Sequence, residues 1–260
     1  MIVNTRRLFL GLLGRLRVDG VCDVGSMNGA EALAFRDALP ESRIYAFEPN
    51  PQNFRSMAAN PIFAARRVAL LPFAATNRDG AADFFVVEAD YSADDDRRGM
   101  SSLYARAGEW ASSSVVSVRT IRLDSFLTRD RASTAPLALW IDSEGMAYEV
   151  IEGASGVAEQ IQLIHAEVET TACIGPKQRL YGEVKALLER LGFMELATDA
   201  PRNREQFNSL YLRADLPAPL RWRIRASLLG ARLRYLVVAM LLRFFPRFVA
   251  RWRDRRIGAT

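Results

Sequence analysis

Histidine and cysteine are scarce in this chain of 260 residues, which contains one histidine, His165, and two cysteines, Cys22 and Cys173. A single imidazole excludes a metal centre built mainly on histidine. Two thiols cannot form a disulfide framework, and these two lack the paired spacing of a zinc site. We therefore expect a protein that folds on a hydrophobic core in a reducing compartment, the cytoplasm.

Long apolar runs are also lacking. The longest run near the C-terminus, at residues 235–242, has eight residues, whereas a helix that crosses a bilayer needs about 20. Residues 1–17 carry arginines on both sides of a short apolar stretch, without the cleavage site of a secretory signal. The sequence thus predicts no transmembrane span, and it predicts an amphipathic helix over residues 1–17 that packs on the domain.

Lysine is nearly absent, and arginine carries the positive charge in an uneven distribution. Residues 216–260 contain 11 arginines and one acid, Asp254, so this segment has a charge of +10, whereas residues 1–215 have a charge of −5. Two prolines mark the boundary between a domain of residues 18–215 and this tail. Such an asymmetry indicates an anionic partner, either a membrane surface or a nucleic acid.

Short apolar segments alternate with helical ones along residues 18–215. This alternation predicts an α/β fold with a mostly parallel central sheet and helices on both faces. The expected strands are residues 20–25, 43–48, 63–71, 82–88, 115–123, 137–142, 161–168, 193–197 and 207–212, and the expected helices include 30–39 and 177–191.

A glycine turn follows the first expected strand, in the sequence Asp23-Val24-Gly25-Ser26-Met27-Asn28-Gly29. A glycine between a strand and a helix lets the backbone approach a ligand, with the helix N-terminus behind it. The glycine spacing differs from the G-x-G-x-x-G of dinucleotide sites, and an acid that enters the turn is suited to an ammonium group. The candidate cofactor contacts in this turn are Asp23, Gly25, Ser26, Asn28 and Gly29.

A second acid lies at the end of the second expected strand, in the sequence Ala46-Phe47-Glu48-Pro49-Asn50-Pro51. Glu48 comes 23 residues after Gly25, and an acid about 20 residues beyond a glycine turn is placed to bind both ribose hydroxyls of a nucleoside. Glu48 and Pro49 therefore join the candidate cofactor contacts. A glycine turn, a ribose-binding acid and an amine-binding acid together indicate S-adenosylmethionine.

Two further acids, Asp142 and Glu144, leave the end of a buried strand in the sequence Trp140-Ile141-Asp142-Ser143-Glu144-Gly145. In an open α/β sheet this is the crevice that binds ligands. Together with Glu167, near the end of the next strand, they are the candidate catalytic residues, as a general base or an orienting acceptor. Asp142 and Glu144 are alternatively hard oxygen ligands for a divalent ion. His165 is expected to be a hydrogen-bonded core residue.

These three segments together resemble the FkbM-type family of S-adenosylmethionine-dependent methyltransferases, over roughly residues 18–213. The chain departs from the family at three positions: Met27 replaces the usual asparagine, Trp140 replaces a lysine, and Ala147 stands where a third acid is common. Both cofactor-binding acids are retained. We therefore expect the departures to affect substrate choice and rate more than cofactor binding.

The resemblance implies a Rossmann-like class I methyltransferase fold and methyl transfer to a hydroxyl of a sugar, a glycolipid or a secondary metabolite. It also suggests that Ser101 and Ser102, in the serine-rich stretch of residues 99–114, close over the cofactor. Two other classes of function stay open. One is a non-catalytic binding module that keeps the fold, for which the three departures are the evidence. The other is a nucleic-acid methyltransferase that uses the basic tail, but such an enzyme should carry an Asn-Pro-Pro-Tyr-type signature, which is missing.

The tail pattern predicts a helix from about residue 220 to residue 245, with arginines on a narrow face and apolar residues over much of the rest. Residues 220–256 are suited to an anionic membrane interface. This would place the protein peripherally on the inner face of a membrane, beside a lipid-linked acceptor. The alternatives are a helix packed on the domain itself or on a second subunit of a homo-oligomer. Nucleic-acid binding is disfavoured because it leaves the apolar surface unused.

Overall fold

The computed structural model describes residues 2–90, 95–106, 113–130 and 135–244. Residues 245–256 of the predicted membrane-binding segment, with their cluster of arginines, lie outside the described residues.

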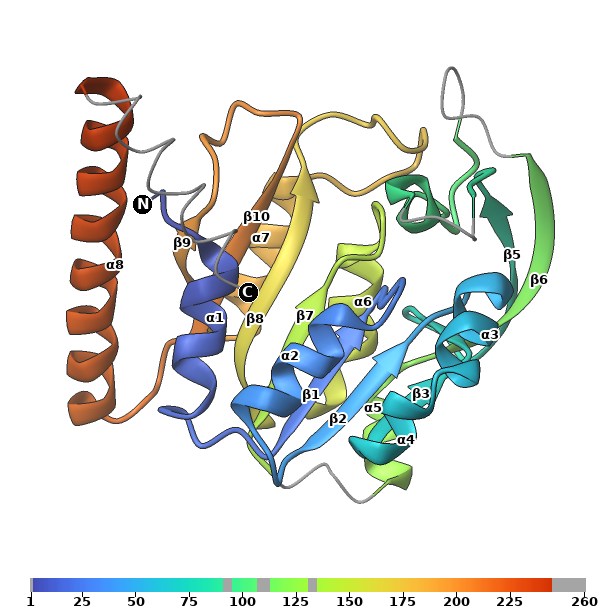
Figure 1. Ribbon diagram of the computed structural model, residues 1–260, viewed down its shortest axis with the longest axis horizontal. Coiled ribbons are helices and arrows are strands. Elements are labelled where there is room, and N and C mark those ends of the chain that lie inside the picture. Colours follow the sequence, from blue (N-terminus) through green and yellow to red (C-terminus); the bar gives the residue numbers. More distant parts are fainter. Residues whose placement is uncertain (1, 91–94, 107–112, 131–134, 245–260) are drawn as a thin grey trace, which may run out of the picture.

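Seven strands form the central sheet in the order β3-β2-β1-β7-β8-β10-β9 (Figure 1). All neighbours pair in parallel except β10, which runs antiparallel to β8 and β9. The predicted mostly parallel sheet is thereby confirmed. The strands are β1 (Gly20–Val24), β2 (Arg43–Phe47), β3 (Val68–Leu71), β7 (Leu137–Ile141), β8 (Ile161–Glu169), β9 (Phe193–Thr198) and β10 (Gln206–Arg213).

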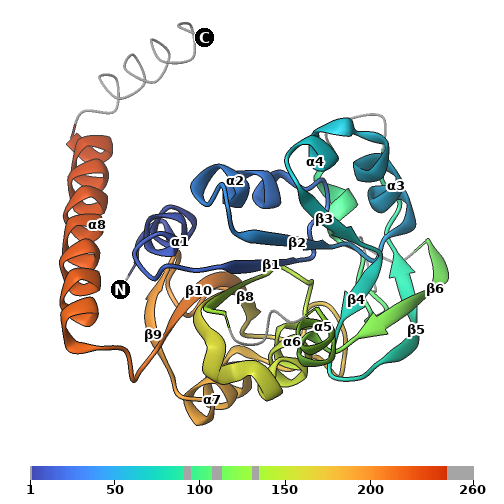
Figure 2. The ribbon, with the colours of Figure 1, turned by 90° about the horizontal axis from the view of Figure 1, so that it is seen from below.

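Helices cover both faces of this sheet, which gives two hydrophobic layers (Figure 2). One layer lies under α1 and α2, and the other under α5, α6 and α7, while α3 and α4 lie beside the edge strand β3. The helices are α1 (Thr5–Leu13), α2 (Ala30–Ala38), α3 (Pro51–Ala59), α4 (Pro61–Ala65), α5 (Leu123–Arg129), α6 (Ala147–Gly153), α7 (Tyr181–Arg190) and α8 (Ala218–Phe244).

The expected strand at residues 63–71 is wrong in its first half, which is helical. Helix α4 begins after Asn60, whose side chain accepts a hydrogen bond of 3.1 Å from the Ile62 amide, and proline occupies its first position. Both features favour a helix start. Phe63 is buried as the inner face of this short helix, and β3 begins only at Val68.

A second, three-stranded sheet is inserted between β3 and β7, with the order β4-β6-β5. It accounts for the expected strands at residues 82–88 and 115–123. A 3-10 helix, η1 (Asp96–Gly99), lies between the second and third strands of this sheet, in the polar stretch, and another, η3 (Ser155–Gln160), precedes β8. The strands of this sheet are β4 (Phe73–Ala75), β5 (Gly80–Val86) and β6 (Ser114–Ile121).

Helix α1 is held on the sheet by an aromatic cluster. Phe9 is fully buried, and its ring meets the Trp140 ring edge-on at a centroid distance of 5.3 Å. Trp140 in turn stacks on His165 at 3.6 Å. His165 also shares a hydrogen bond of 3.1 Å between Nε2 and Thr5 Oγ1, and burial lowers the pKa of its imidazole to about 3. His165 is therefore a neutral core residue.

The same cluster explains the replacement of the family's lysine by Trp140. Its side chain is 6% exposed and packs between α1, α2 and β8, away from the carboxyl end of β7. The expectation that this departure bears on substrate choice finds no support in the structure. At this position the Trp140 indole stacks on the His165 imidazole and fills the core beneath α1.

Helix α8 stands at the outer edge of the molecule, beside α1 in both views (Figures 1 and 2). Ile224 is buried against the core under α1, with Leu220 and Leu228 packed around it. Over the described residues, none of the helices has the length and apolar character needed to cross a membrane.

Substituting Phe9→Ala should lower the free energy of unfolding by about 3–5 kcal/mol, because it removes a fully buried ring and leaves a cavity beside Trp140. Urea denaturation followed by circular dichroism measures this loss. Arg7→Ala on the exposed face of the same helix is the control and should change stability little. Equal stabilities of the two variants would contradict the role of the aromatic cluster.

Candidate active site

The turn after β1 lies directly against the end of β7. Gly25 has a φ of +85°, and a Cβ atom at this position would collide with the carbonyl oxygen of Asp142. The Gly25 amide donates a 3.1 Å hydrogen bond to the Phe47 carbonyl, and the Asp142 amide donates a 2.9 Å bond to the Val24 carbonyl. Because only glycine fits here, the carboxyl ends of β1, β2 and β7 meet around one point.

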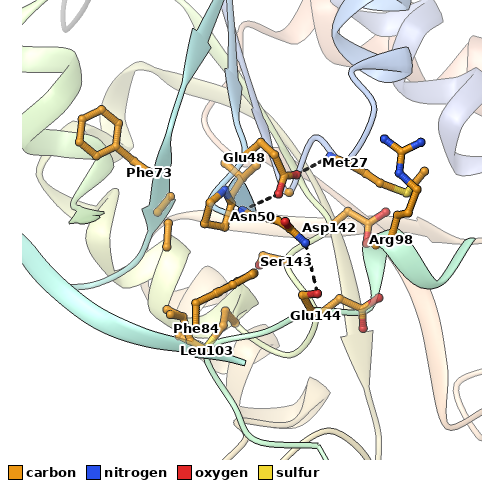
Figure 3. A pocket seen from close by; sticks show the side chains of 18 residues that line it. Met27, Glu48, Asn50, Phe73, Phe84, Arg98, Leu103, Asp142, Ser143 and Glu144 are labelled. Atoms are coloured by element: carbon orange, nitrogen blue, oxygen red, sulfur yellow. Dashed lines mark hydrogen bonds between the residues drawn. The ribbon is translucent and has the colours of Figure 1, made fainter. Parts of the chain in front are cut away.

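Glu48 links the turn after β1 to the helix that follows β2. Its buried carboxylate accepts hydrogen bonds from the backbone amides of Met27, at 2.6 Å, and Asn50, at 2.8 Å (Figure 3). Burial raises the pKa of Glu48 to about 8, although these two hydrogen bonds and one from the Asn53 side chain oppose the shift.

Met27 lies in the left-handed region, with a φ of 50°. Asparagine adopts this conformation more readily than methionine does, which gives a physical reason for the family's usual asparagine. Met27 keeps the turn geometry nevertheless, and its amide makes the contact with Glu48.

A pocket of about 510 Å³, open solvent at its mouth included, lies between these segments (Figure 3). Gly25, Glu48 and Asp142 line one side of it. Apolar side chains from the inserted sheet and from the segment between β5 and β6 form the opposite wall, namely Phe73, Ala74, Ala75, Phe84 and Leu103. The pocket therefore combines a floor that carries carboxyl groups with an apolar wall, as ligand sites commonly do.

Four of the predicted cofactor contacts shape the turn and are not among the residues that line the pocket. Asp23 is 1% exposed and accepts a hydrogen bond from the Ser26 hydroxyl, and burial raises its pKa to about 7. Asn28 accepts a 3.0 Å bond from the Ala30 amide at the start of α2. Gly29 has a φ of +78°, and a Cβ there would collide with the Phe63 ring.

The two predicted serines are part of the pocket wall. Ser101 lines the pocket, and its hydroxyl accepts bonds from the Val87 amide, at 3.1 Å, and Asn50 Nδ2, at 3.5 Å. Ser102 is not in the lining, but its hydroxyl donates a 2.7 Å bond to the Glu144 carbonyl. Both are buried, so they fasten the inserted segment to the ends of β2 and β7.

Arg98 is a pocket residue that the sequence reasoning missed. Its guanidinium donates a 3.2 Å hydrogen bond to the Asn53 side chain, which in turn donates a 2.9 Å bond to the Arg98 carbonyl. Both side chains are buried, and Arg98 lines the pocket. No motif surrounds it in the sequence, so only the fold brings it to the site.

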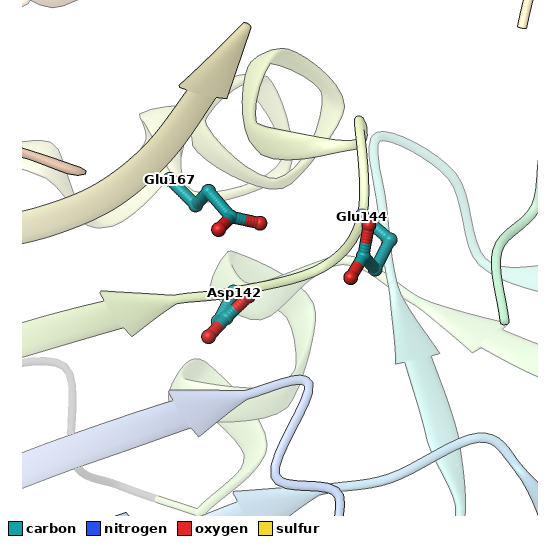
Figure 4. A group of neighbouring side chains, drawn as sticks. All are labelled: Asp142, Glu144 and Glu167. Atoms are coloured by element: carbon teal, nitrogen blue, oxygen red, sulfur yellow. The ribbon is translucent and has the colours of Figure 1, made fainter. Parts of the chain in front are cut away.

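The three candidate catalytic acids lie together beside the pocket. Each of Asp142, Glu144 and Glu167 offers a carboxylate oxygen within 4.8 Å of the others (Figure 4). Asp142 and Glu144 line the pocket, whereas Glu167 is behind them on β8. Arg106 forms a largely buried ion pair with Glu144, and sequence reasoning missed this partner as well.

Burial raises the pKa of every acid in this group, and the charge of Asp142 adds to the shift of Glu144 and Glu167. Burial, with the charge of Asp142 second, raises the pKa of Glu167 to about 11. Burial raises the pKa of Asp142 too, and it raises that of Glu144 to about 7 against the opposing charge of Arg106. At neutral pH Glu167 therefore holds a proton that it shares with Asp142 through their hydrogen bond. The group can accept a proton from a ligand in the pocket, or supply oxygen ligands to a divalent cation.

The sequence matches the methyltransferase FkbM domain over residues 23–194. The chain belongs to this family. The predicted resemblance is thereby confirmed, and methyl transfer is the chemistry of this family. A search of curated protein sequences found no significant match.

Among solved structures, the chain is similar to a precorrin-6y C5,15-methyltransferase from Geobacter metallireducens, with 15% identity, a TM-score of 0.42, and coverage of 80% of this chain and 86% of that one. A methyltransferase FkbM from Methylobacillus flagellatus shows 12% identity and a TM-score of 0.45 over 75% of this chain and 43% of that one. A magnesium protoporphyrin IX methyltransferase from Synechocystis, with bound SAM, shows 12% identity and a TM-score of 0.42 over 80% and 78%.

The Glu167→Gln variant should be more stable than the wild type, increasingly so as the pH rises. Folding raises the pKa of Glu167 from 4.5 to about 11, so between these values the folded chain holds a proton that the unfolded chain releases. This carboxyl therefore lowers the stability of the wild type progressively as the pH rises through that window. We expect a difference on the order of 1 kcal/mol or more at pH 8.

Urea denaturation at pH values from about 5 to about 9 measures this dependence. The control is Glu189→Gln, at a side chain that is 57% exposed on α7. A difference between Glu167→Gln and the wild type that stays constant with pH would show that Glu167 is not held protonated.

Proposed function

We propose that this chain is an S-adenosylmethionine-dependent O-methyltransferase that acts on a hydroxyl group of a sugar, a glycolipid or a secondary metabolite. Membership of the FkbM methyltransferase family supports the methyl transfer. The observation that carries the proposal for oxygen is the group of acids at the pocket, because a hydroxyl must lose its proton as it is methylated.

The pocket fits the proposed cofactor. Glu48 lines the pocket and is the proposed partner of the ribose hydroxyls, and the missing side chain at Gly25 leaves room for close backbone approach. The apolar wall with Phe73 and Leu103 suits a flat purine. Asp23 is bonded to Ser26 beneath the turn, and its contact with the amino group of the cofactor stays a prediction.

Asp142 is the proposed proton acceptor. It lines the pocket and stays partly exposed, whereas Glu167 behind it carries a proton at neutral pH. Bound S-adenosylmethionine would supply a methyl group with an electron-poor carbon. Asp142 would orient the acceptor hydroxyl toward this methyl group and take the proton of the hydroxyl. Glu144, held by Arg106, fixes the loop that carries Asp142.

The proposed site of the acceptor is a polar hollow next to the pocket. A second hollow of about 980 Å³, open solvent included, shares Leu103 and Met146 with the first pocket. Its lining offers hydroxyl, amide and charged side chains suited to a compound with several hydroxyl groups, namely Thr76, Asn77, Arg78, Asp83, Tyr104, Thr120 and Glu149.

A divalent cation held by the acids is a second version of the same function. The oxygens of Asp142, Glu144 and Glu167 lie close enough to bind one ion. In this version the three acids would hold the cation, which would lower the pKa of the acceptor hydroxyl. A binding module without catalysis, and a nucleic-acid methyltransferase, lack a comparable observation.

Glu48→Ala should abolish detectable S-adenosylmethionine binding, a loss of at least about 100-fold, because it removes two charge-assisted hydrogen bonds to the ribose. Isothermal titration calorimetry measures the affinity, and a thermal melt shows whether the variant folds. Glu41→Ala is the control, since Glu41 is exposed and far from the pocket. Unchanged affinity of Glu48→Ala would remove the cofactor assignment at this residue.

Asp142→Asn should lower turnover by about 10²–10⁴-fold while cofactor affinity changes little, because only the reacting hydroxyl needs the charge. The acceptor is first identified by mass spectrometry of glycans and glycolipids from cells with and without the gene. It is the compound whose mass is lower by one methylene group in the cells without the gene. Transfer of labelled methyl to that compound then gives the rate.

The exposed Asp37→Asn variant is the control for this measurement. Near-normal turnover of Asp142→Asn would refute the role as a base. Loss of wild-type turnover with a chelator, and its return with magnesium, would instead select the version with a cation.

A further inference from the structure

Helix α8 has an inner face that packs on the protein and an outer face that does not. On the inner face, Ile224 is 1% exposed and joins the core under α1. The contacts with α1 hold this part of the helix in place. The helix is therefore docked, and its opposite side is presented to the surroundings (Figure 2).

The outer face carries an apolar stripe. Of the eight large hydrophobic side chains that are exposed among the described residues, five lie on α8. At about 100° per residue these five fall within about 80° of one another, opposite Ile224. The stripe consists of Trp222 (74% exposed), Leu229 (59%), Leu233 (55%), Val237 (50%) and Met240 (52%).

Arginines flank this stripe on both sides. Arg221 and Arg232 lie about 80–100° from Trp222 in one direction around the helix, and Arg223 lies about 100° from it in the other. All three are exposed. The side chains of Arg225, Arg234 and Arg243 lie outside the described ones. An apolar band with cations on both sides is the arrangement of a helix that lies in a membrane interface.

We propose that the stripe of α8 inserts into the headgroup region of an anionic lipid membrane, with the flanking arginines bound to lipid phosphates. Charge complementarity selects this occupant. Residues 216–260 carry 11 arginines against one acid, so pairing two copies of the stripe would bring two segments of charge +10 together. A nucleic acid would neutralise the arginines but leave five apolar side chains in water.

Sedimentation of the full chain with lipid vesicles tests this docking. The vesicles contain phosphatidylcholine with about 30% phosphatidylglycerol, or phosphatidylcholine alone, at about 50 mM and about 500 mM salt. The wild type should pellet with the anionic vesicles at low salt, and more weakly in the other three conditions. The double variant Leu229→Glu/Leu233→Glu should bind at least about tenfold more weakly, because it places acids in the stripe without touching the core.

The control is Val115→Glu/Met194→Glu, which makes the same change at two exposed apolar residues away from α8 and should bind as the wild type does. A thermal melt and calorimetric cofactor binding show whether each variant is folded. If Leu229→Glu/Leu233→Glu does not fold, the double variant Leu229→Ser/Leu233→Ser replaces it. Equal sedimentation of the wild type and the α8 variant would overturn the proposal. Failure of the wild type to sediment with any of the vesicles would also overturn it. If light scattering then shows a wild-type dimer that the α8 variant does not form, the stripe is a contact between two copies of the chain and not a membrane contact.

Discussion

The contact between the turn after β1 and the end of β7 is the constraint on which the site depends. A side chain at Gly25 would occupy the space of the Asp142 carbonyl, so the two strand ends can meet only while this residue is glycine. That contact fixes where Asp142 leaves the sheet, and the amide bonds of Glu48 fix the neighbouring turn. The cofactor acid and the proposed base thus take their positions from one backbone arrangement.

Much of this site could be predicted because the signals are local. A strand, a helix and a second strand have a nearly fixed combined length, so an acid 23 residues after Gly25 returns to the same edge of the sheet. Asp142 and Glu144 follow β7, Glu167 lies near the end of the adjacent parallel strand β8, and the ends of such strands lie side by side. The sheet itself follows from the alternation of apolar strands with helices, which needs no knowledge of distant contacts.

The rest depends on tertiary structure that no short pattern records. Arg98 and Arg106 come from a polar stretch without periodicity, and they reach the site because the inserted sheet folds back over it. Trp140 occupies a position where the family pattern has a lysine, yet its surroundings are set by Phe9, which is over 100 residues away. The hydrogen bond from the Ser26 hydroxyl to Asp23 is likewise a detail of the folded turn that the spacing of the motif does not indicate.

The small sheet has a consequence for how such a chain can diversify. Strands β4, β5 and β6 pair only with one another among the described strands, yet they and the segment between β5 and β6 form one wall of both hollows. Residues in this wall can change in size and polarity without disturbing the register of the seven-stranded sheet. The residues that hold the ends of β1, β2 and β7 together are thus separate from those through which a different acceptor could be accommodated.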